Sequence, residues 1–159
     1  MGYYIRLTGS DFRIKSENKD KALQALRELM SYEHELGNGG TPSGRHFSWL
    51  NNAQPLRWRT LEDALEDWRF SPINDSDGNI IGLQFTGEKL GQENYLFWAI
   101  SSWVEDGSYI QITGEYGGTW RLVFEDGDVR EERVNDKEMG LYNWDYLDGS
   151  NELEAMTKP

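Results

Sequence analysis

The chain offers few side chains for nucleophilic chemistry. It has no cysteine and only two histidines, His34 and His46. The lack of cysteine excludes disulfides, thiolate nucleophiles and cysteine-based zinc sites. His46 lies two residues before Ser48, so a strand through both places them on one face. A serine nucleophile of the hydrolase type sits in a Gly-x-Ser-x-Gly turn, which the sequence lacks. We therefore predict no catalytic residue and a protein that is not an enzyme.

Two segments resemble ligand loops but miss the residues that bind. Asp75-Ser76-Asp77-Gly78 is similar to part of a calcium loop. When Gly78 is placed at the invariant glycine of that loop, however, Ile73 and Gln84 fall at two positions that require acidic ligands. Residues Gly39–His46 match the glycine spacing of a phosphate-binding loop. In this chain, residues 39–46 run from a predicted helix into a predicted strand. A phosphate-binding loop runs from a strand into a helix, so here no helix N-terminus would meet a phosphate. We expect no metal and no cofactor.

One irregular stretch is a candidate ligand site. Trp58 lies between Arg57 and Arg59, where its ring is available for cation–π stacking or for contact with a ligand. Together with His46 and the glycine-rich loop Gly37–Gly44, these residues form an alternative hypothesis. Under it, the protein is a small-molecule or carbohydrate-binding module, or a minor enzyme.

Carboxylates gather in two runs. The first, which we call the helix run, consists of Glu62, Asp63, Glu66 and Asp67. Their spacing of i, i+1, i+4 and i+5 places all four on one side of a predicted helix. Like charges repel at i, i+4, and no basic residue within the run relieves them. The strand run follows a predicted turn and consists of Glu125, Asp126, Asp128, Glu131 and Glu132. Such carboxylates dock on basic protein patches or imitate duplex phosphates, so we predict both runs as partner-binding residues.

Three helices are predicted to position these residues. The first is capped by Asn18 and runs to about His34, with an apolar stripe at helical spacing. The second starts at Thr60 with a capping box closed by Asp63, and buries Leu61, Ala64, Leu65 and Trp68. The third covers Gln92–Val104. It is apolar around most of its circumference, which predicts that it is the most buried of the three.

Seven strands are predicted from alternation and turn residues. Their ranges are Tyr3–Thr8, Arg45–Leu50, Arg69–Ile73, Asn79–Phe85, Ser108–Thr113, Thr119–Phe124 and Asp128–Val134. Ile81, Leu83 and Phe85 alternate as in a strand with one buried face. The last strand carries charge on both faces, which predicts a sheet edge.

The order β-α-β-α-β-β-α-β-β-β predicts an α+β fold. Runs of adjacent strands favour a mostly antiparallel sheet with about three helices packed on one face. Residues 1–134 are predicted to form a single domain, and residues 135–159 an acidic, aromatic-containing C-terminal extension. Under a third hypothesis the protein is a structural or oligomerisation domain. In that case the extension, with Tyr142, Trp144 and Tyr146, would pack against a second copy of the chain.

The net charge of −12 is unevenly distributed. Residues 1–50 hold seven basic and six acidic side chains, residues 51–100 four and eight, and residues 101–159 five and fourteen. This acidity repels nucleic acid and anionic membranes, so we expect neither to bind directly. With no signal peptide and no apolar run of about 20 residues, we expect a cytoplasmic location.

The first hypothesis is therefore a non-enzymatic acidic protein that docks on a basic protein partner, for example a nucleic-acid-binding protein. In size and acidity the chain is similar to small inhibitor proteins of phages and mobile elements, including DNA mimics, and to toxin-immunity proteins. This similarity implies an inhibitor. It is one of composition, so no residue role follows from it.

Overall fold

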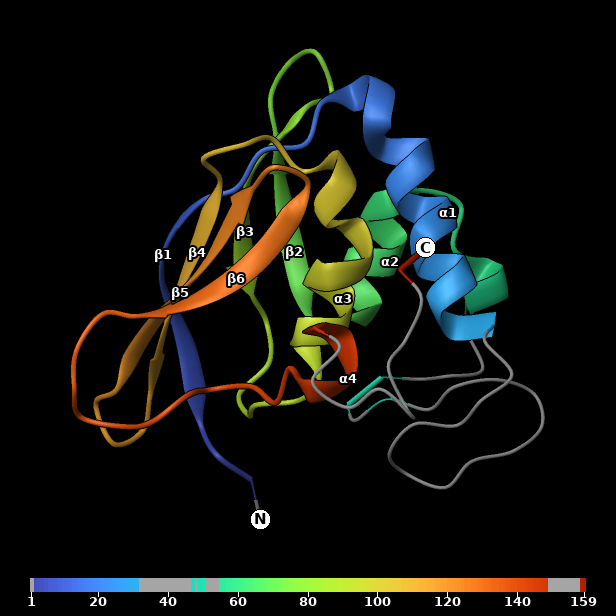
Figure 1. Ribbon diagram of the computed structural model, residues 1–159. Helices are drawn as coiled ribbons and strands as arrows, with labels where there is room; N and C mark the ends of the chain where they lie inside the picture. The colour runs from blue at the N-terminus through green and yellow to red at the C-terminus, as the bar shows by residue number, and fades with distance from the viewer. Residues whose placement is uncertain (1, 32–46, 48, 51–54, 149–157) are drawn as a thin grey trace.

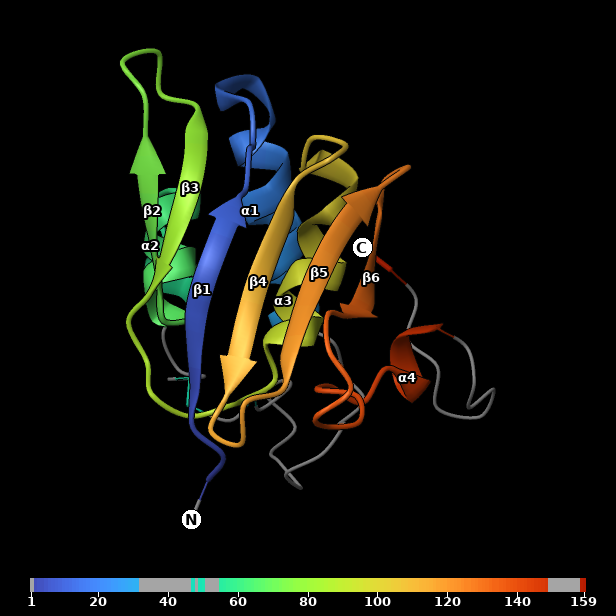
Figure 2. The same ribbon diagram turned by 90° about the vertical axis from the view of Figure 1, so that its left-hand side faces the viewer.

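The computed structural model describes residues 2–31, 47, 49–50, 55–148 and 158–159. An antiparallel four-stranded sheet has the order β1-β4-β5-β6, and β2 pairs with β3 in a separate hairpin. The strands are β1 (Ile5–Asp11), β2 (Phe70–Asn74), β3 (Ile80–Phe85), β4 (Tyr109–Gly114), β5 (Thr119–Glu125) and β6 (Asp128–Arg133). The hairpin lies beside β1 (Figure 2), where Ile14 and Ile80 exchange two backbone hydrogen bonds.

The longer helices cover one face of the strands (Figure 1). The helices are α1 (Lys19–Ser31), α2 (Leu61–Asp67), α3 (Glu93–Ile100) and α4 (Asp145–Asp148), and the 3-10 turns are η1 (Ser16–Asn18), η2 (Pro55–Arg57) and η3 (Ser101–Trp103). Every residue of α3 is buried, as its all-round apolar pattern predicts. The core is aromatic at its centre, where Phe12, Phe97 and Phe124 meet edge to face.

These elements confirm the predicted α+β class and most of the predicted segments. The meander of β4, β5 and β6 is present, and β6 is an edge strand, as its charge on both faces indicates. Asn18, which was predicted as the N-cap of the first helix, is instead the last residue of the 3-10 turn Ser16–Asn18, and α1 follows directly at Lys19. Its predicted end at His34 lies outside the described residues.

The capping box of α2 is also confirmed. Thr60 Oγ1 accepts the backbone N–H of Asp63 at 3.2 Å, and Asp63 Oδ2 accepts the backbone N–H of Thr60 at 3.3 Å. Leu61, Ala64 and Leu65 are buried as predicted. Arg69 takes a left-handed conformation, with φ of 73°, directly after the helix. This position usually favours glycine, so tertiary contacts must hold Arg69 there.

Two strand predictions differ from the structure. Ile81 was expected on the buried face of its strand but is 47% exposed, whereas Ile80 is buried. The reason is a bulge: Ile73 pairs with Gly82 and Asn74 with Ile80, so Ile81 is the extra, unpaired residue of β3 and breaks the alternation. The strand expected over residues 45–50 lies largely outside the described residues, and Trp49 and Leu50 belong to a turn and a bend.

The segment that follows β6 packs against the domain. Leu141 is buried, and Tyr142, Trp144 and Leu147 lie against the core. The indole N–H of Trp120 donates to the carbonyl oxygen of Met139 at 2.8 Å. Part of the predicted extension therefore belongs to the body of the domain. None of the helices formed by the described residues is long and apolar enough to cross a membrane.

Candidate functional site

The two acidic runs lie on opposite sides of the molecule. Helix α2 lies behind the β2–β3 hairpin, whereas β6 forms the far edge of the sheet (Figure 2). One flat basic surface therefore does not cover both runs at once. Each run has to be judged by the contacts of its own carboxylates.

In the helix run, three of the four carboxylates are used inside the fold. Glu62 forms an ion pair with Lys19 of α1 and accepts a 2.8 Å hydrogen bond from the amide of Asn74. Asp63 closes the capping box, and Asp67 accepts the indole N–H of Trp58 at 2.6 Å. The repulsion expected from the sequence is relieved by Lys19, which comes from a different helix. Glu66 is exposed.

Substituting Lys19 with methionine is expected to lower the free energy of unfolding by about 1–2 kcal/mol at neutral pH. Burial alone would raise the pKa of Glu62, but hydrogen bonds from Lys19 and Asn74 outweigh it and leave this pKa below its usual value. A lowered folded-state pKa stabilises the fold above the unfolded-state pKa, and this contribution disappears on acidification through the folded-state pKa. Urea unfolding of both proteins at several pH values should show their difference shrink below about pH 4. A difference independent of pH would contradict this pairing.

The alternative ligand residues border the same helix. A groove of about 470 Å³ is lined by Arg57, Trp58, Arg59, Asp63, Glu66 and Asp67. The arginines are exposed, but Trp58 is only 2% exposed and belongs to the core. Its carbonyl oxygen also accepts a hydrogen bond from Arg27. Trp58 therefore offers little ring surface for stacking. His46 and residues 37–44 lie outside the described residues.

The strand run joins a larger surface that the sequence did not reveal. Figure 2 shows four segments at one end of the sheet: the β2–β3 turn, the end of β1, the start of β4 and the β5–β6 turn. We call this surface the acidic end. Its carboxylates are Asp11, Glu17, Asp75, Asp77, Glu105, Asp106, Glu125, Asp126 and Asp128. They outnumber the basic side chains interleaved with them, which include Arg13, Lys15, Arg130 and Lys158.

A repeated dipeptide could have indicated this surface. Asp77-Gly78, Asp106-Gly107 and Asp126-Gly127 each form a turn, and all three glycines have positive φ. In an antiparallel sheet, alternate turns lie at the same end. The β4–β5 turn, at the opposite end, has Tyr116-Gly117 in place of Asp-Gly. Once the strand order is known, the positions of the Asp-Gly turns in the sequence therefore indicate that their carboxylates lie at the same end of the sheet.

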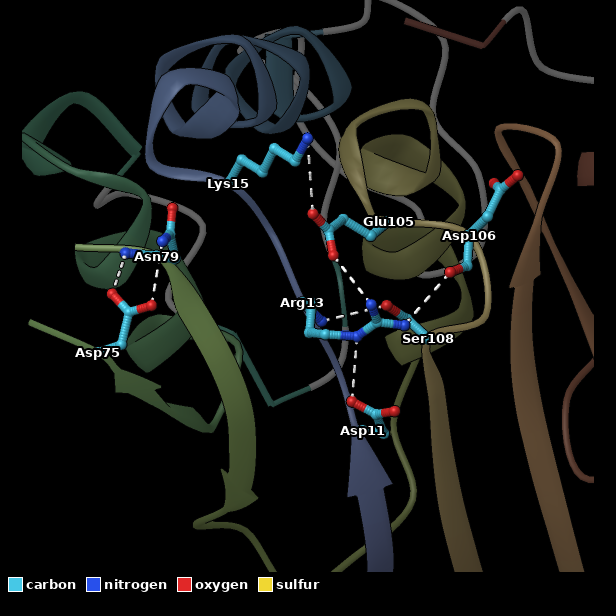
Figure 3. Close-up of polar contacts among 8 residues, drawn as sticks. All are labelled: Asp11, Arg13, Lys15, Asp75, Asn79, Glu105, Asp106 and Ser108. Carbon is cyan, nitrogen blue, oxygen red and sulfur yellow. Dashed lines mark hydrogen bonds and ion pairs between the residues drawn. The ribbon is translucent and has the colours of Figure 1, made fainter. Parts of the chain in front are cut away.

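Arg13 ties the centre of the acidic end together (Figure 3). Its guanidinium lies 3.1 Å from Asp11 and 3.0 Å from Glu105, and donates to the carbonyl oxygen of Asp106 at 3.2 Å. Its backbone N–H donates to the buried hydroxyl of Ser108 at 3.1 Å. Lys15 also lies 3.9 Å from Glu105, so the three carboxylates of Asp11, Glu105 and Asp106 exceed the two basic groups of Arg13 and Lys15 by one negative charge.

The tip of the β2–β3 hairpin is fixed to this centre. Asp75 accepts hydrogen bonds from the backbone and the side-chain amide of Asn79, which lower the pKa of Asp75. Asn79 Oδ1 accepts the backbone N–H of Ser16 at 2.8 Å. Between these segments lies a groove of about 340 Å³, with buried Ile80 and exposed Lys15 and Glu17 among its lining residues.

The β5–β6 turn extends the acidic end on the other side. The backbone N–H of Asp126 donates to Asp106 Oδ1 at 3.0 Å, which joins this turn to the start of β4. Arg130 is shared between Glu125, at 3.4 Å, and Glu132, at 3.5 Å. Glu125, Asp126 and Asp128 are all exposed. They are the members of the strand run whose placement suits contact with a partner.

Glu131, in contrast, serves the fold. It occupies the pair position opposite Leu122, whose side chain is fully buried. Its carboxylate accepts the backbone N–H groups of Leu141 at 2.8 Å and Tyr142 at 3.1 Å, and the indole N–H of Trp144 at 3.1 Å. Its carboxylate therefore anchors the segment after β6.

A buried charged cluster lies at the opposite end of the sheet. Glu93 is 1% exposed and accepts hydrogen bonds from Arg69 at 2.7 Å, the backbone of Gly91 at 3.0 Å and the hydroxyl of Tyr142 at 3.1 Å. Burial raises the pKa of Glu93, and the charge of Arg69 partly offsets this effect. Burial and the Glu93 carboxylate both raise the pKa of Tyr142. The cluster links three segments, which indicates a structural brace.

No group of three or more His, Cys, Asp and Glu side chains among the described residues could hold a metal ion. Comparison with known proteins gives no further assignment. No family model matches the chain, and no curated protein or solved structure is significantly similar to it.

Proposed function

We propose that this chain is a non-enzymatic, cytoplasmic binding protein whose acidic end docks on a basic protein partner. The observation that carries the proposal is the convergence of carboxylates from four separate segments on one end of the sheet. A solubilising charge needs no such convergence, whereas complementarity to a basic patch does. The partner class we favour is a nucleic-acid-binding protein, which the chain would inhibit as a DNA mimic or an immunity protein.

Rigidity supports this proposal. The four segments are joined by hydrogen bonds from the backbone N–H groups of Ser16, Arg13 and Asp126 to the side chains of Asn79, Ser108 and Asp106, respectively. Carboxylates held by a fixed backbone lose little conformational freedom when a partner binds. The helix run supports the proposal less, because Glu62, Asp63 and Asp67 already have partners within the fold.

The test reverses charge at the acidic end alone. The triple variant Glu125→Lys, Asp126→Lys, Asp128→Lys is expected to weaken partner binding by about tenfold or more, because like charges then face each other across the interface. Wild-type protein first captures the partner from its native host at low salt. The purified partner is then titrated calorimetrically at two salt concentrations. Binding should weaken at the higher concentration, because the electrostatic screening length falls with salt, to about 10 Å at 0.1 M.

A second triple variant is the matched control. Glu66→Lys, Glu88→Lys, Asp136→Lys makes the same change in net charge at exposed positions outside the acidic end. It should keep most of the affinity. If both variants lose affinity equally, net charge rather than the acidic end drives binding, and the proposal is wrong.

The groove beside α2 supports a second candidate function. Its exposed Arg57 and Arg59 face Asp63, Glu66 and Asp67 across about 470 Å³, a volume suited to a small polar molecule. Because Trp58 is buried, such a ligand would be held by charges and hydrogen bonds rather than by stacking. The oligomerisation hypothesis is less supported, since Tyr142 and Trp144 pack within their own chain.

A further inference from the structure

The β5–β6 turn already holds a basic side chain from a distant part of the chain. The ammonium of Lys158 donates a 2.7 Å hydrogen bond to the carbonyl oxygen of Gly127, 31 residues away in sequence. The same ammonium lies 3.6 Å from Oδ1 of Asp128. The Lys158 side chain is 26% exposed, so it lies partly within the surface rather than extending into solvent.

The backbone around this contact is fixed independently of Lys158. Asp126 and Gly127 both have positive φ, 54° and 76°, as in the tight hairpin turns that favour Asp-Gly. The hydroxyl oxygen of Ser101, a fully buried residue, lies 3.2 Å from the same Gly127 carbonyl oxygen and 2.8 Å from that of Trp98, so its single proton is shared between the two. The carbonyl and the adjacent Asp128 carboxylate therefore form a preorganised seat for an ammonium group.

We infer that this seat is a lysine-binding site for the partner, and that Lys158 occupies it as an internal competitor. The inference rests on the proposed function. It adds to it the chemical group that the acidic end recognises, and a way in which the affinity of the acidic end for its partner is set. A partner lysine would make the contacts that Lys158 makes now. Glu125, which pairs with Arg130, and Asp106, which accepts the backbone N–H of Asp126, are both exposed and can attract further basic groups of the partner.

The internal contact is weak enough to be displaced. Desolvation in the seat lowers the pKa of Lys158, and the attraction of Asp128 only partly offsets this cost. A single, partly exposed ion pair contributes little free energy. A partner that presents several basic groups would therefore exchange with Lys158, because only the partner also engages the neighbouring carboxylates.

The probe for this inference is hexalysine, titrated into the full chain at low salt. Lys158→Met should bind hexalysine about three- to sixfold more tightly than wild type, because the seat no longer has to be vacated. Lys137→Met is the matched control. It removes the same charge from an exposed lysine outside the acidic end and should leave the affinity close to that of wild type. Amide NMR shifts of Gly127 and Asp128 should change in Lys158→Met before any probe is added.

The outcomes separate this inference from the proposed function. Equal affinities for Lys158→Met and Lys137→Met, with unchanged Gly127 and Asp128 shifts, would overturn the inference while leaving acidic-end docking intact. Failure of hexalysine to shift these amides in any variant would overturn the lysine site itself. Equal loss of partner by the two charge-reversal triples would overturn the proposed function, whatever hexalysine does.

Discussion

Replacing Glu93 with alanine is expected to lower the free energy of unfolding by about 3–5 kcal/mol, because it leaves the charge of Arg69 buried without its partner. The Arg69 side chain is 15% exposed and the Glu93 side chain 1%, so water cannot solvate the guanidinium well after the change. Arg69 also holds a left-handed backbone conformation, which the ion pair helps to maintain. Urea unfolding measures the loss, which corresponds to a melting temperature about 6–20 °C lower.

Glu88→Ala provides the control for this prediction. Glu88 is an exposed carboxylate five positions earlier, and its removal should change stability by less than about 0.5 kcal/mol. Glu93→Gln should cost less than Glu93→Ala, because the amide oxygen still accepts from Gly91 and Tyr142. If Glu93→Ala were no more destabilising than Glu88→Ala, the cluster would not be a brace.

The second large effect is expected at Glu131. Its replacement by alanine removes the acceptor of three N–H groups, from Leu141, Tyr142 and Trp144, and should destabilise the protein by about 2–4 kcal/mol. The segment after β6 should then detach first. Hydrogen exchange at the Leu141 and Tyr142 amides and limited proteolysis between residues 135 and 144 would detect this opening.

Glu132 offers an unusually close control for Glu131. It is the next residue in β6, has the same side chain and is exposed, with Arg130 at 3.5 Å. Glu132→Ala should change stability by less than about 1 kcal/mol. A Glu131→Ala protein that kept its stability but lost its partner would restore Glu131 to the docking surface and contradict the anchoring role.

Local patterns predicted most of the elements. The capping box at Thr60, the apolar circumference of α3 and the alternation of β4 and β5 depend on neighbours within a few residues. The register of β3 could not be predicted in this way, because the bulge at Ile81 arises from the pairing of β3 with β2. The mistake over Ile81 follows from that bulge.

The contacts of the individual carboxylates could not be predicted from the sequence. In the strand run, Glu125, Asp126 and Asp128 are exposed, whereas the Glu131 carboxylate accepts hydrogen bonds from the segment after β6. The helix run contained Glu62 and Asp67, whose partners Lys19 and Trp58 come from other segments. A count of carboxylates does not reveal which of them a fold uses, since those contacts are long-range.

The sequence by itself determined that this is an acidic α+β domain with a charged edge strand, because periodicity, capping and turn chemistry act locally. Only the tertiary structure decided which carboxylates lie together. Antiparallel pairing brings the turns at Asp106 and Asp126 to one end of the four-stranded sheet, and the bridge between Ile14 and Ile80 places the hairpin turn at Asp77 beside them, although the three are far apart in the chain. Charge acts through space, so the surface that it forms depends on strand order rather than on distance along the sequence.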